Sequence, residues 1–513
     1  MSFFLISSDD NNDNNYFNGM AFSESSIVLS LSGLENYLKS ANSLFELVDG
    51  RFSLCWNDGE KRIFTVDRTG QDCWFYYKEN DFWAVSNSLY ALGERLKERG
   101  RFRLRKSGFI FYEIRHSLGE QPYSEETSID GVKILPKDCY ITVSSDFFKV
   151  EKHQKLRKVE SQEDYCQRLV HYVAVWKARL RSLISHVSAG AVRCDISGGI
   201  DSRIVMGLSS SELHNKKIKY STNKAWNDDY LIVSMLSKAL GFKIDNTEIS
   251  RPRVVSAEKA LELYKKGNSG VYKNIYFSKF LTAYPSLHLH GAGGENIRGL
   301  SSGSAWKVVH RLKSQFKNDA LYEDFRHDYL GWFEKNDIDF KSDDSTIAHY
   351  RHFRGRFHFG RNWYRSLTNP LVTPLESSDL EMMADYLIKV GRDPKALQFD
   401  MLYLCDKFLP FFPFDTENKK FSHEVISDSL KYIANFSIRK NDFEVTVFGD
   451  FPLNSSEECS SVTDMDIKKL ALNEISNFSK NATGEYVEVI SKLLNDDVNR
   501  IKAYGAISIM KLV

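Results

Sequence analysis

Apolar and polar residues alternate in short runs over the first 95 or so residues, and polar clusters such as residues 9–15 separate the runs. This alternation predicts a mostly β domain with a loose N-terminal end. Farther along, residues 163–186 carry apolar side chains on one helical face, which predicts a long amphipathic helix. The apolar positions of that face are Leu169, Val173, Val175, Leu180 and Leu183.

Beyond residue 190 the chain alternates between short apolar runs and helical patterns. Residues 191–194 and 218–222 are predicted strands, and helices are expected from Ile200 and from Asp228 to a stop at Gly241. The second helix has an apolar face that comprises Leu231, Ile232, Met235, Leu236 and Ala239. Strands separated by helices predict a parallel sheet, whose ligands bind at the carboxyl ends of the strands. The last ninety or so residues are predicted to be helical.

Composition narrows the class of protein. The 513 residues suffice for two or three domains, and 69 Lys+Arg against 68 Asp+Glu leave a net charge of +1. A near-neutral chain has no global attraction to nucleic acid or to an anionic membrane. Neither a transmembrane run nor a signal peptide is evident, so a cytoplasmic location is expected. The seven cysteines form no CxxC pair, which predicts reduced thiols and excludes a zinc ribbon.

The segment CDISGGIDSR, residues 194–203, has the order strand, glycine turn, helix start. Adjacent glycines let backbone N–H groups point into one concavity, and the helix N-terminus adds partial positive charge. The carboxylate of Asp201 would repel phosphate there unless Mg²⁺ lay between them, which indicates a nucleotide rather than free phosphate. The Walker A pattern is absent. The predicted ATP- or pyrophosphate-binding residues here are Ser197, Gly198, Gly199, Asp201 and Ser202.

A second glycine-rich turn follows the predicted strand at residues 287–290 and carries one carboxylate, Glu295. Two such loops on neighbouring strands can hold pyrophosphate and Mg²⁺ from both sides, with Asp201 and Glu295 as metal ligands. The glycines that this loop contributes are Gly291, Gly293 and Gly294.

Both loops resemble known motifs. Ser-Gly-Gly-x-Asp-Ser after a strand is the signature of the ATP pyrophosphatases, and the second loop resembles the second ATP motif of asparagine synthetases, with Glu295 at the position of the metal aspartate. Upstream, the segments Gly50–Trp56, Asp67–Gly70, Phe75–Tyr77 and Ala84–Asn87 resemble inner strands of the class II glutaminase domain. The chain thus resembles the asparagine synthetase and β-lactam synthetase superfamily, which includes lasso-peptide cyclases.

The resemblance implies an α/β fold with a degenerate glutaminase-like α+β sandwich over residues 1–155. A doubly wound parallel sheet of the ATP-pyrophosphatase type, with a helical C-terminal part, would occupy residues 156–513. The implied enzyme is an ATP-dependent carbon–nitrogen ligase that forms AMP. It would adenylate a small-molecule or peptide carboxylate with ATP and Mg²⁺, and then transfer the acyl group to an amine. Partner proteins of a biosynthetic cluster, for an antibiotic or peptide, also fit this class; a membrane partner does not.

The family also implies roles for individual residues. The backbone around Ser221 and Thr222 would meet the adenine, and Asp228 or Asp229 would hold substrate or cap a helix. Lys420, with Lys419 as the second choice, falls near the late catalytic lysine, which stabilises charge on the α-phosphate and the tetrahedral intermediate. A solvated lysine pair is the alternative. The segment Leu371–Glu376 resembles the family's Pro-Phe-Leu-Asp.

Three positions depart from the family. Ser2 replaces the nucleophilic cysteine, and a hydroxyl is far less ionised than a thiol, so we expect a glutaminase relic. Ala292 stands where asparagine synthetases have glutamate and β-lactam synthetases tyrosine, residues that help the amine lose its proton. His290 is the candidate replacement, with a core histidine as the alternative. Arg203 suggests either an acidic substrate group or a salt bridge.

Other functions stay open. Residues 349–365 are rich in Arg, His and aromatics, which suits an RNA surface, although a helix lining the substrate pocket is preferred. A zinc site from His349, His352 and His358 lacks a supporting ligand pattern. The alternatives to the ligase are a tRNA- or base-modifying adenylating enzyme and a non-catalytic scaffold of the same fold. The sequence leaves open the carboxylate, the amine, and whether the amide is intramolecular.

Overall fold

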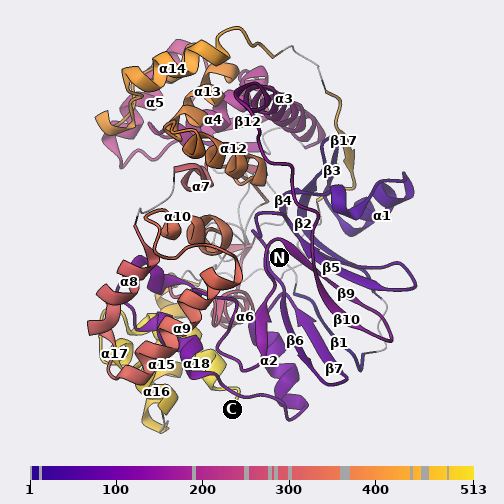
Figure 1. Ribbon diagram of the computed structural model, residues 1–513, viewed down its shortest axis with the longest axis vertical. Coiled ribbons are helices and arrows are strands. Elements are labelled where there is room, and N and C mark those ends of the chain that lie inside the picture. The colour runs from indigo at the N-terminus through magenta and orange to yellow at the C-terminus, as the bar shows by residue number, and fades with distance from the viewer. Residues whose placement is uncertain are drawn as a thin grey trace.

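The computed structural model shows a mixed α/β protein (Figure 1). It describes residues 3–10, 14–187, 192–247, 253–274, 280–281, 287–298, 303–358, 370–438, 443–451, 462–481 and 485–513. Within these ranges no helix is both long enough and apolar enough to cross a membrane.

Two sheets face each other in the N-terminal part. The larger has the strand order β10-β9-β5-β4-β2-β3-β17 and the smaller β1-β7-β6-β8. Apolar side chains from both sheets, among them Ile6, Phe64 and Val85, form one buried cluster between them. The strands are β1 (Leu5–Ser7), β2 (Tyr16–Phe22), β3 (Ser26–Val28), β4 (Asp49–Asn57), β5 (Arg62–Val66), β6 (Phe75–Glu79), β7 (Phe82–Ser86), β8 (Val132–Ile134), β9 (Cys139–Val143) and β10 (Phe148–Lys152); the helices here are α1 (Leu31–Lys39) and α2 (Leu89–Glu98).

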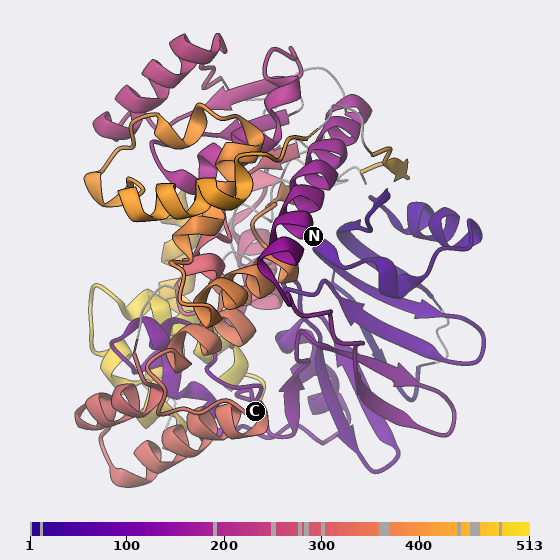
Figure 2. The ribbon, with the colours of Figure 1, turned by 45° about the horizontal axis from the view of Figure 1, so that its top comes forward.

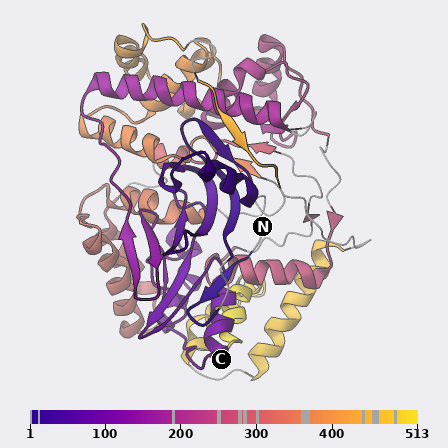
Figure 3. The same ribbon diagram turned by 90° about the vertical axis from the view of Figure 1, so that its right-hand side faces the viewer.

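The edge strand β17 (Thr446–Phe448) comes from the C-terminal part of the chain and pairs in parallel with β3 (Figures 1 and 3). The prediction that the last ninety or so residues are helical is confirmed for most of the described residues there, but it missed this strand. A three-residue strand has no periodicity of its own, and its hydrogen bonds come from a partner far away in the sequence. By pairing with β3, it covers an edge that the sheet would otherwise expose.

A third sheet is parallel and has the strand order β12-β11-β15-β16. Its strands β11 (Val192–Asp195), β12 (Ile218–Ser221), β15 (Leu287–Leu289) and β16 (Leu371–Val372) all run in one direction. This confirms the three predicted strands, at residues 191–194, 218–222 and 287–290, and places the carboxyl ends of β11 and β15 side by side, in the register Cys194 to Leu289. A separate two-stranded sheet joins β13 (Arg253–Val254) and β14 (Phe280–Leu281).

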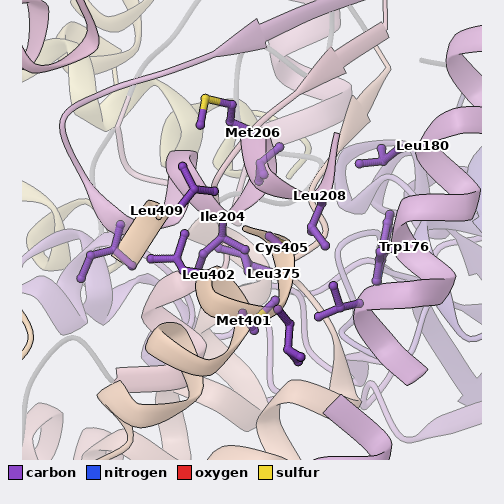
Figure 4. Close-up of a cluster of buried hydrophobic side chains, with 14 of the residues drawn as sticks. Trp176, Leu180, Ile204, Met206, Leu208, Leu375, Met401, Leu402, Cys405 and Leu409 are labelled. Atoms are coloured by element: carbon purple, nitrogen blue, oxygen red, sulfur yellow. The ribbon is translucent and has the colours of Figure 1, made fainter. Parts of the chain in front are cut away.

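Helices α3 (Gln162–His186), α4 (Ile200–Leu208), α5 (Asn227–Leu240), α12 (Ser378–Lys389), α13 (Lys395–Cys405) and α14 (His423–Ile433) surround this sheet (Figures 1 and 2). Figure 4 labels Ile204 of α4, Met401 of α13 and Trp176 of α3 within one buried apolar cluster. Cys194 is fully buried in this core, as expected of a small apolar side chain. Of the predicted apolar face of α5 only Ile232 and Leu236 are buried, whereas Leu231, Met235 and Ala239 are exposed.

A helical layer packs against the smaller sheet and α2 (Figure 1). It consists of α6 (Ala257–Asn268), α8 (Ala305–Leu312), α9 (Asp319–Lys335), α10 (Ser345–His349), α11 (Gly355–His358), α15 (Asp464–Asn481), α16 (Glu485–Val489), α17 (Ser491–Leu494) and α18 (Tyr504–Met510). A π-helical turn, Tyr350–Arg354, joins α10 to α11. The short helix α7 (Gly294–Arg298) lies between this layer and the parallel sheet.

Candidate functional site

The first loop, residues 196–199, connects β11 to α4, as the glycine pattern predicts. Ser197 and Ser202 hold it together: the backbone N–H of Ser197 donates to Ser202 Oγ at 3.0 Å, and the two hydroxyl oxygens lie 2.9 Å apart. The N-cap residue of α4 is Gly199, and no side chain caps the helix there. A helix N-terminus without a side-chain cap has backbone N–H groups and partial positive charge to offer an anion.

The second loop, residues 290–293, connects β15 to α7 and touches the first loop. A Cβ atom on Gly291 would lie 2.7 Å from the Ser202 backbone nitrogen, and one on Gly294 would lie 2.2 Å from Asp201 Oδ1. Gly293 has φ +103°, a conformation that side chains rarely adopt. The glycines are therefore required because two backbones and one carboxylate meet here.

The predicted metal ligands fit Mg²⁺ in chemistry. The Asp201 carboxylate lies against Gly294, the residue directly before Glu295, so the two acidic residues belong to adjoining parts of the two loops. Within the described ranges no three His, Cys, Asp or Glu residues form a metal cluster. Two carboxylates are a sufficient protein share for Mg²⁺, which usually completes its octahedral shell with phosphate and water oxygens.

A third acidic residue, Glu376, lies behind the second loop. It is the last residue of the segment that resembles Pro-Phe-Leu-Asp, and Asn296 Nδ2 donates to its Oε2 at 2.6 Å. Burial, together with the negative charge of Glu295, holds the pKa of Glu376 well above its usual range. Its surroundings therefore favour the protonated carboxyl group more strongly than water does.

The structure separates the two candidate lysines. Lys419 Nζ donates to Asp415 Oδ2 at 2.6 Å and lies 3.6 Å from the position of a Cβ on Gly199, so it stands over the first loop. Lys420 Nζ instead pairs with Glu417 at 2.7 Å, with about half of its side chain exposed. Lys419 is the lysine that the fold brings to the first glycine loop.

Asp229 belongs to α5 but packs against the first loop. Its Oδ1 accepts a hydrogen bond from the backbone N–H of Gly198 at 2.8 Å. Burial raises the pKa of Asp229, the Gly198 hydrogen bond opposes this, and the neighbouring Asp415 raises it further. Asp229, one of the two aspartates expected to hold substrate or cap a helix, therefore contacts the candidate nucleotide site; Asp228 is exposed.

Within the part of the chain that the structure describes, Arg203 bonds to backbone carbonyls and forms no salt bridge, one of its two expected roles. Its guanidinium is buried and donates to the backbone carbonyls of Phe412 at 2.8 Å and Pro413 at 2.7 Å, with its charge over the Phe414 ring. Burial lowers the pKa of Arg203 to about 10. Arg203 thus ties α4 to the segment that carries Asp415.

Beside the predicted adenine contacts, the ends of the strands carry a polar cluster that the sequence analysis missed. Ser221 Oγ donates to Asp195 Oδ1 at 2.6 Å, and His288 Nε2 lies 2.8 Å from Asp195 Oδ2. The backbone N–H of Thr222 donates to Asn246 Oδ1 at 3.0 Å. Charged residues at alternate positions of a parallel strand were the available signal, because such strands are usually apolar on both faces.

His290 is engaged locally. The Ala292 backbone N–H donates to His290 Nδ1 at 3.0 Å, so the proton of the neutral ring is on Nε2. In that tautomer the ring can donate a hydrogen bond to an oxyanion, but Nδ1 cannot accept the proton of an incoming amine. Ala292 itself is buried, and its methyl group offers no chemistry.

The basic, aromatic stretch is largely internal. Arg351 donates to the carbonyls of Asn296 and Ile297 at the end of α7, both at 2.6 Å, and the buried Arg356 donates to Leu135 O at 2.8 Å. His349 is also buried and lies with Nε2 3.0 Å from Tyr123 O. The RNA surface and the zinc site therefore find no support over residues 349–358, and residues 359–365 lie outside the described ranges, as does Ser2.

One further contact was not anticipated. Gln398 of α13 is fully buried, and its Nε2 donates to Asp201 Oδ1 at 2.7 Å. The local sequence of α13 gives no indication that this glutamine contacts a carboxylate.

Comparisons with known proteins add little to this geometry. The chain matches no protein-family model, and it has no significant match among curated proteins. Two solved structures are similar at 10% and 9% identity: glutamine phosphoribosylpyrophosphate amidotransferase from B. subtilis complexed with ADP and GMP, and the allosteric regulatory enzyme of purine biosynthesis. The matches cover 63% and 61% of this chain and 61% and 60% of those chains, each with a TM-score of 0.16. The chain thus spans less than two thirds of either protein, and at this TM-score the similarity carries no argument.

Proposed function

We propose that this protein is an ATP-dependent, AMP-forming carbon–nitrogen ligase of the asparagine synthetase type. The observation that carries the proposal is the contact between two glycine loops at the carboxyl edge of a parallel sheet. Asp201 stands between them, and Lys419 stands over the first loop. That arrangement suits pyrophosphate as a leaving group, because the N-terminus of α4, which has no side-chain cap, and the ammonium group of Lys419 meet at one point.

The reaction would proceed in two steps. A substrate carboxylate oxygen attacks the α-phosphorus of ATP, forming an acyl-adenylate and releasing pyrophosphate; the amine nitrogen then attacks the acyl carbon, and AMP leaves. The first loop binds the departing pyrophosphate, and Lys419 offsets negative charge as it develops. Mg²⁺, held by Asp201 and Glu295, would supply charge neutralisation of the phosphates. In this proposal His290, at the start of the second loop, would donate its Nε2–H to the tetrahedral oxyanion.

The nitrogen source in this proposal is an amine rather than glutamine. Ser2 replaces the family's cysteine, and the ring of Phe4 stacks on Tyr16 with centroids 4.6 Å apart and meets Trp74 edge-on. The backbone N–H of Phe4 donates to Asn87 Oδ1 at 2.9 Å, which anchors the start of the chain among these aromatic rings. We interpret the N-terminal sandwich as a glutaminase-like domain without glutaminase activity, and the C-terminal part as an ATP-pyrophosphatase domain.

Two alternatives are weaker. A tRNA- or base-modifying adenylating enzyme needs a basic surface, whereas the arginines of residues 351–356 bind backbone carbonyls inside the protein. A non-catalytic scaffold would have no use for two acidic residues brought to one phosphate-binding edge, because inward carboxylates are costly without a cation.

The test is to incubate the protein with Mg·ATP and a panel of carboxylates and amines, and to measure pyrophosphate against phosphate release. Pyrophosphate that disappears in Asp201→Ala but persists in Ser2→Ala would support a ligase with a silent glutaminase half. Failure of the wild-type protein to bind Mg·ATP would refute the proposal.

A further inference from the structure

The strongest unexplained feature at the site is the buried amide of Gln398. Its Nε2 donates to Asp201 Oδ1 at 2.7 Å, and it reaches the loop from α13, a helix about two hundred residues farther along the chain. Because a carboxylate accepts hydrogen bonds and does not donate them, this contact fixes which end of the amide faces Asp201. The Asp201 carboxylate is consequently held between the backbone of Gly294 and the amide of Gln398.

The other end of the amide points to a ligand. Gln398 Oε1 is buried, and within the described ranges it has no hydrogen-bond partner. A buried acceptor without a donor is unfavourable, and native structures nearly always supply one. The residues around Gln398 do not offer an obvious donor, since Leu397, Phe399 and Leu402 of the same helix are buried in the apolar core.

A hydrated Mg²⁺ on Asp201 would supply that donor. Mg²⁺ gives up its water reluctantly and keeps several metal-bound waters, whose O–H groups are strong donors. An amide next to a carboxylate ligand can donate through nitrogen to the ligand and accept through oxygen from a metal-bound water. Side chains that orient a ligand in this way change metal affinity by about 10- to 100-fold when they are removed.

We infer that Gln398 is a positioning residue that orients the Asp201 carboxylate for Mg²⁺ and accepts a hydrogen bond from the hydration shell of the ion. The inference rests on the proposed function, because it concerns the same nucleotide site. Gln398 does not touch the reacting atoms; it acts through Asp201. Its removal should change the dependence of nucleotide binding on Mg²⁺ without abolishing the fold.

The principal variant is Gln398→Met, which keeps the length and burial of the side chain and removes both polar groups. Asp400→Asn is the matched control, because Asp400 lies on the same helix and is equally buried, but contacts Tyr165 instead of Asp201. The probe is α,β-methylene-ATP, in which the bond to be cleaved is blocked, and binding is measured by calorimetry over a series of Mg²⁺ concentrations.

We expect Gln398→Met to raise the Mg²⁺ concentration for half-maximal binding by about 10-fold or more, and Asp400→Asn to leave it within about twofold. An unchanged Mg²⁺ dependence in Gln398→Met, with wild-type protein responding to Mg²⁺, would overturn the role of Gln398 and leave the ligase proposal standing. Absence of Mg²⁺-dependent binding in wild-type protein would overturn both.

A second variant covers the case in which Gln398→Met folds poorly. Gln398→Glu keeps the shape of the side chain but places a second carboxylate against Asp201, so the metal-free protein should unfold at a lower temperature than wild type. Mg²⁺ should then stabilise this variant more than it stabilises wild-type protein, since the ion relieves the repulsion. Equal stabilisation of the two proteins by Mg²⁺ would overturn the inference.

Discussion

Asp400 gives the structure a measurable dependence on pH. Its carboxyl group is enclosed between α13, α3 and α14; burial raises its pKa from 3.8 to about 6, and the hydrogen bond from the Tyr165 hydroxyl only partly opposes this. Between pH 4 and 6 the folded protein therefore retains a proton that the unfolded chain has lost. Stability must fall as the pH rises through this interval, because the native state binds more protons there.

The magnitude follows from the two pKa values. A rise from 3.8 to about 6 corresponds to about 3 kcal/mol, at about 1.4 kcal/mol for each pKa unit. Asp400→Asn removes the titrating group and keeps an acceptor for Tyr165, so the variant should be about 3 kcal/mol more stable than wild type at pH 7.5. Below pH 4 this advantage should vanish.

The assay is urea unfolding, followed by tryptophan fluorescence at pH 4, 5, 6 and 7.5, for both proteins. The informative quantity is the difference between variant and wild type, because other titrating groups cancel in it. A difference that stays constant from pH 4 to 7.5 would refute the burial argument.

Three further predictions concern the site. Lys419→Met should lower the rate of pyrophosphate release by about 100-fold or more and Lys420→Met by less than about threefold, measured with the responding substrate; equal losses would contradict the assignment. Gly294→Ala should weaken binding of α,β-methylene-ATP with Mg²⁺ by about 10-fold or more, since the new Cβ meets a carboxylate, whereas Gly331→Ala, which fills open space on α9, should not. The free energy of unfolding of Glu376→Gln, relative to wild type, should increase as the pH is raised from 4 to 9 in urea unfolding, because burial and the charge of Glu295 raise the pKa of Glu376 in the folded state; a difference independent of pH would contradict this.

Much of the site could be predicted because its requirements are local. A strand, two adjacent glycines and a helix that carries Asp201 in its first turn together determine the conformation of the first loop. The same holds for the loop before Glu295. Helix α3 and the stop of α5 at Gly241, which has φ +75°, also follow from patterns within a few residues. In each case the determining contacts lie close together in the chain.

The remaining features depend on contacts between distant segments. The choice of Lys419 over Lys420 is made by Asp415, and the burial of Arg203 by carbonyl groups of Phe412 and Pro413, two hundred residues away. The sequence did not predict a role for Gln398, because that role depends on a contact with Asp201, which lies about two hundred residues away in the chain.

The sequence by itself determined the two glycine turns and the parallel order of strands and helices around them. Only the tertiary structure decided which charged and polar side chains complete the site, and that the edge strand β17 closes the N-terminal sheet. The physical reason is the range of the interactions. Backbone conformation and helix dipoles act within one turn of chain, whereas hydrogen bonds to buried charges form wherever packing brings a donor and an acceptor together.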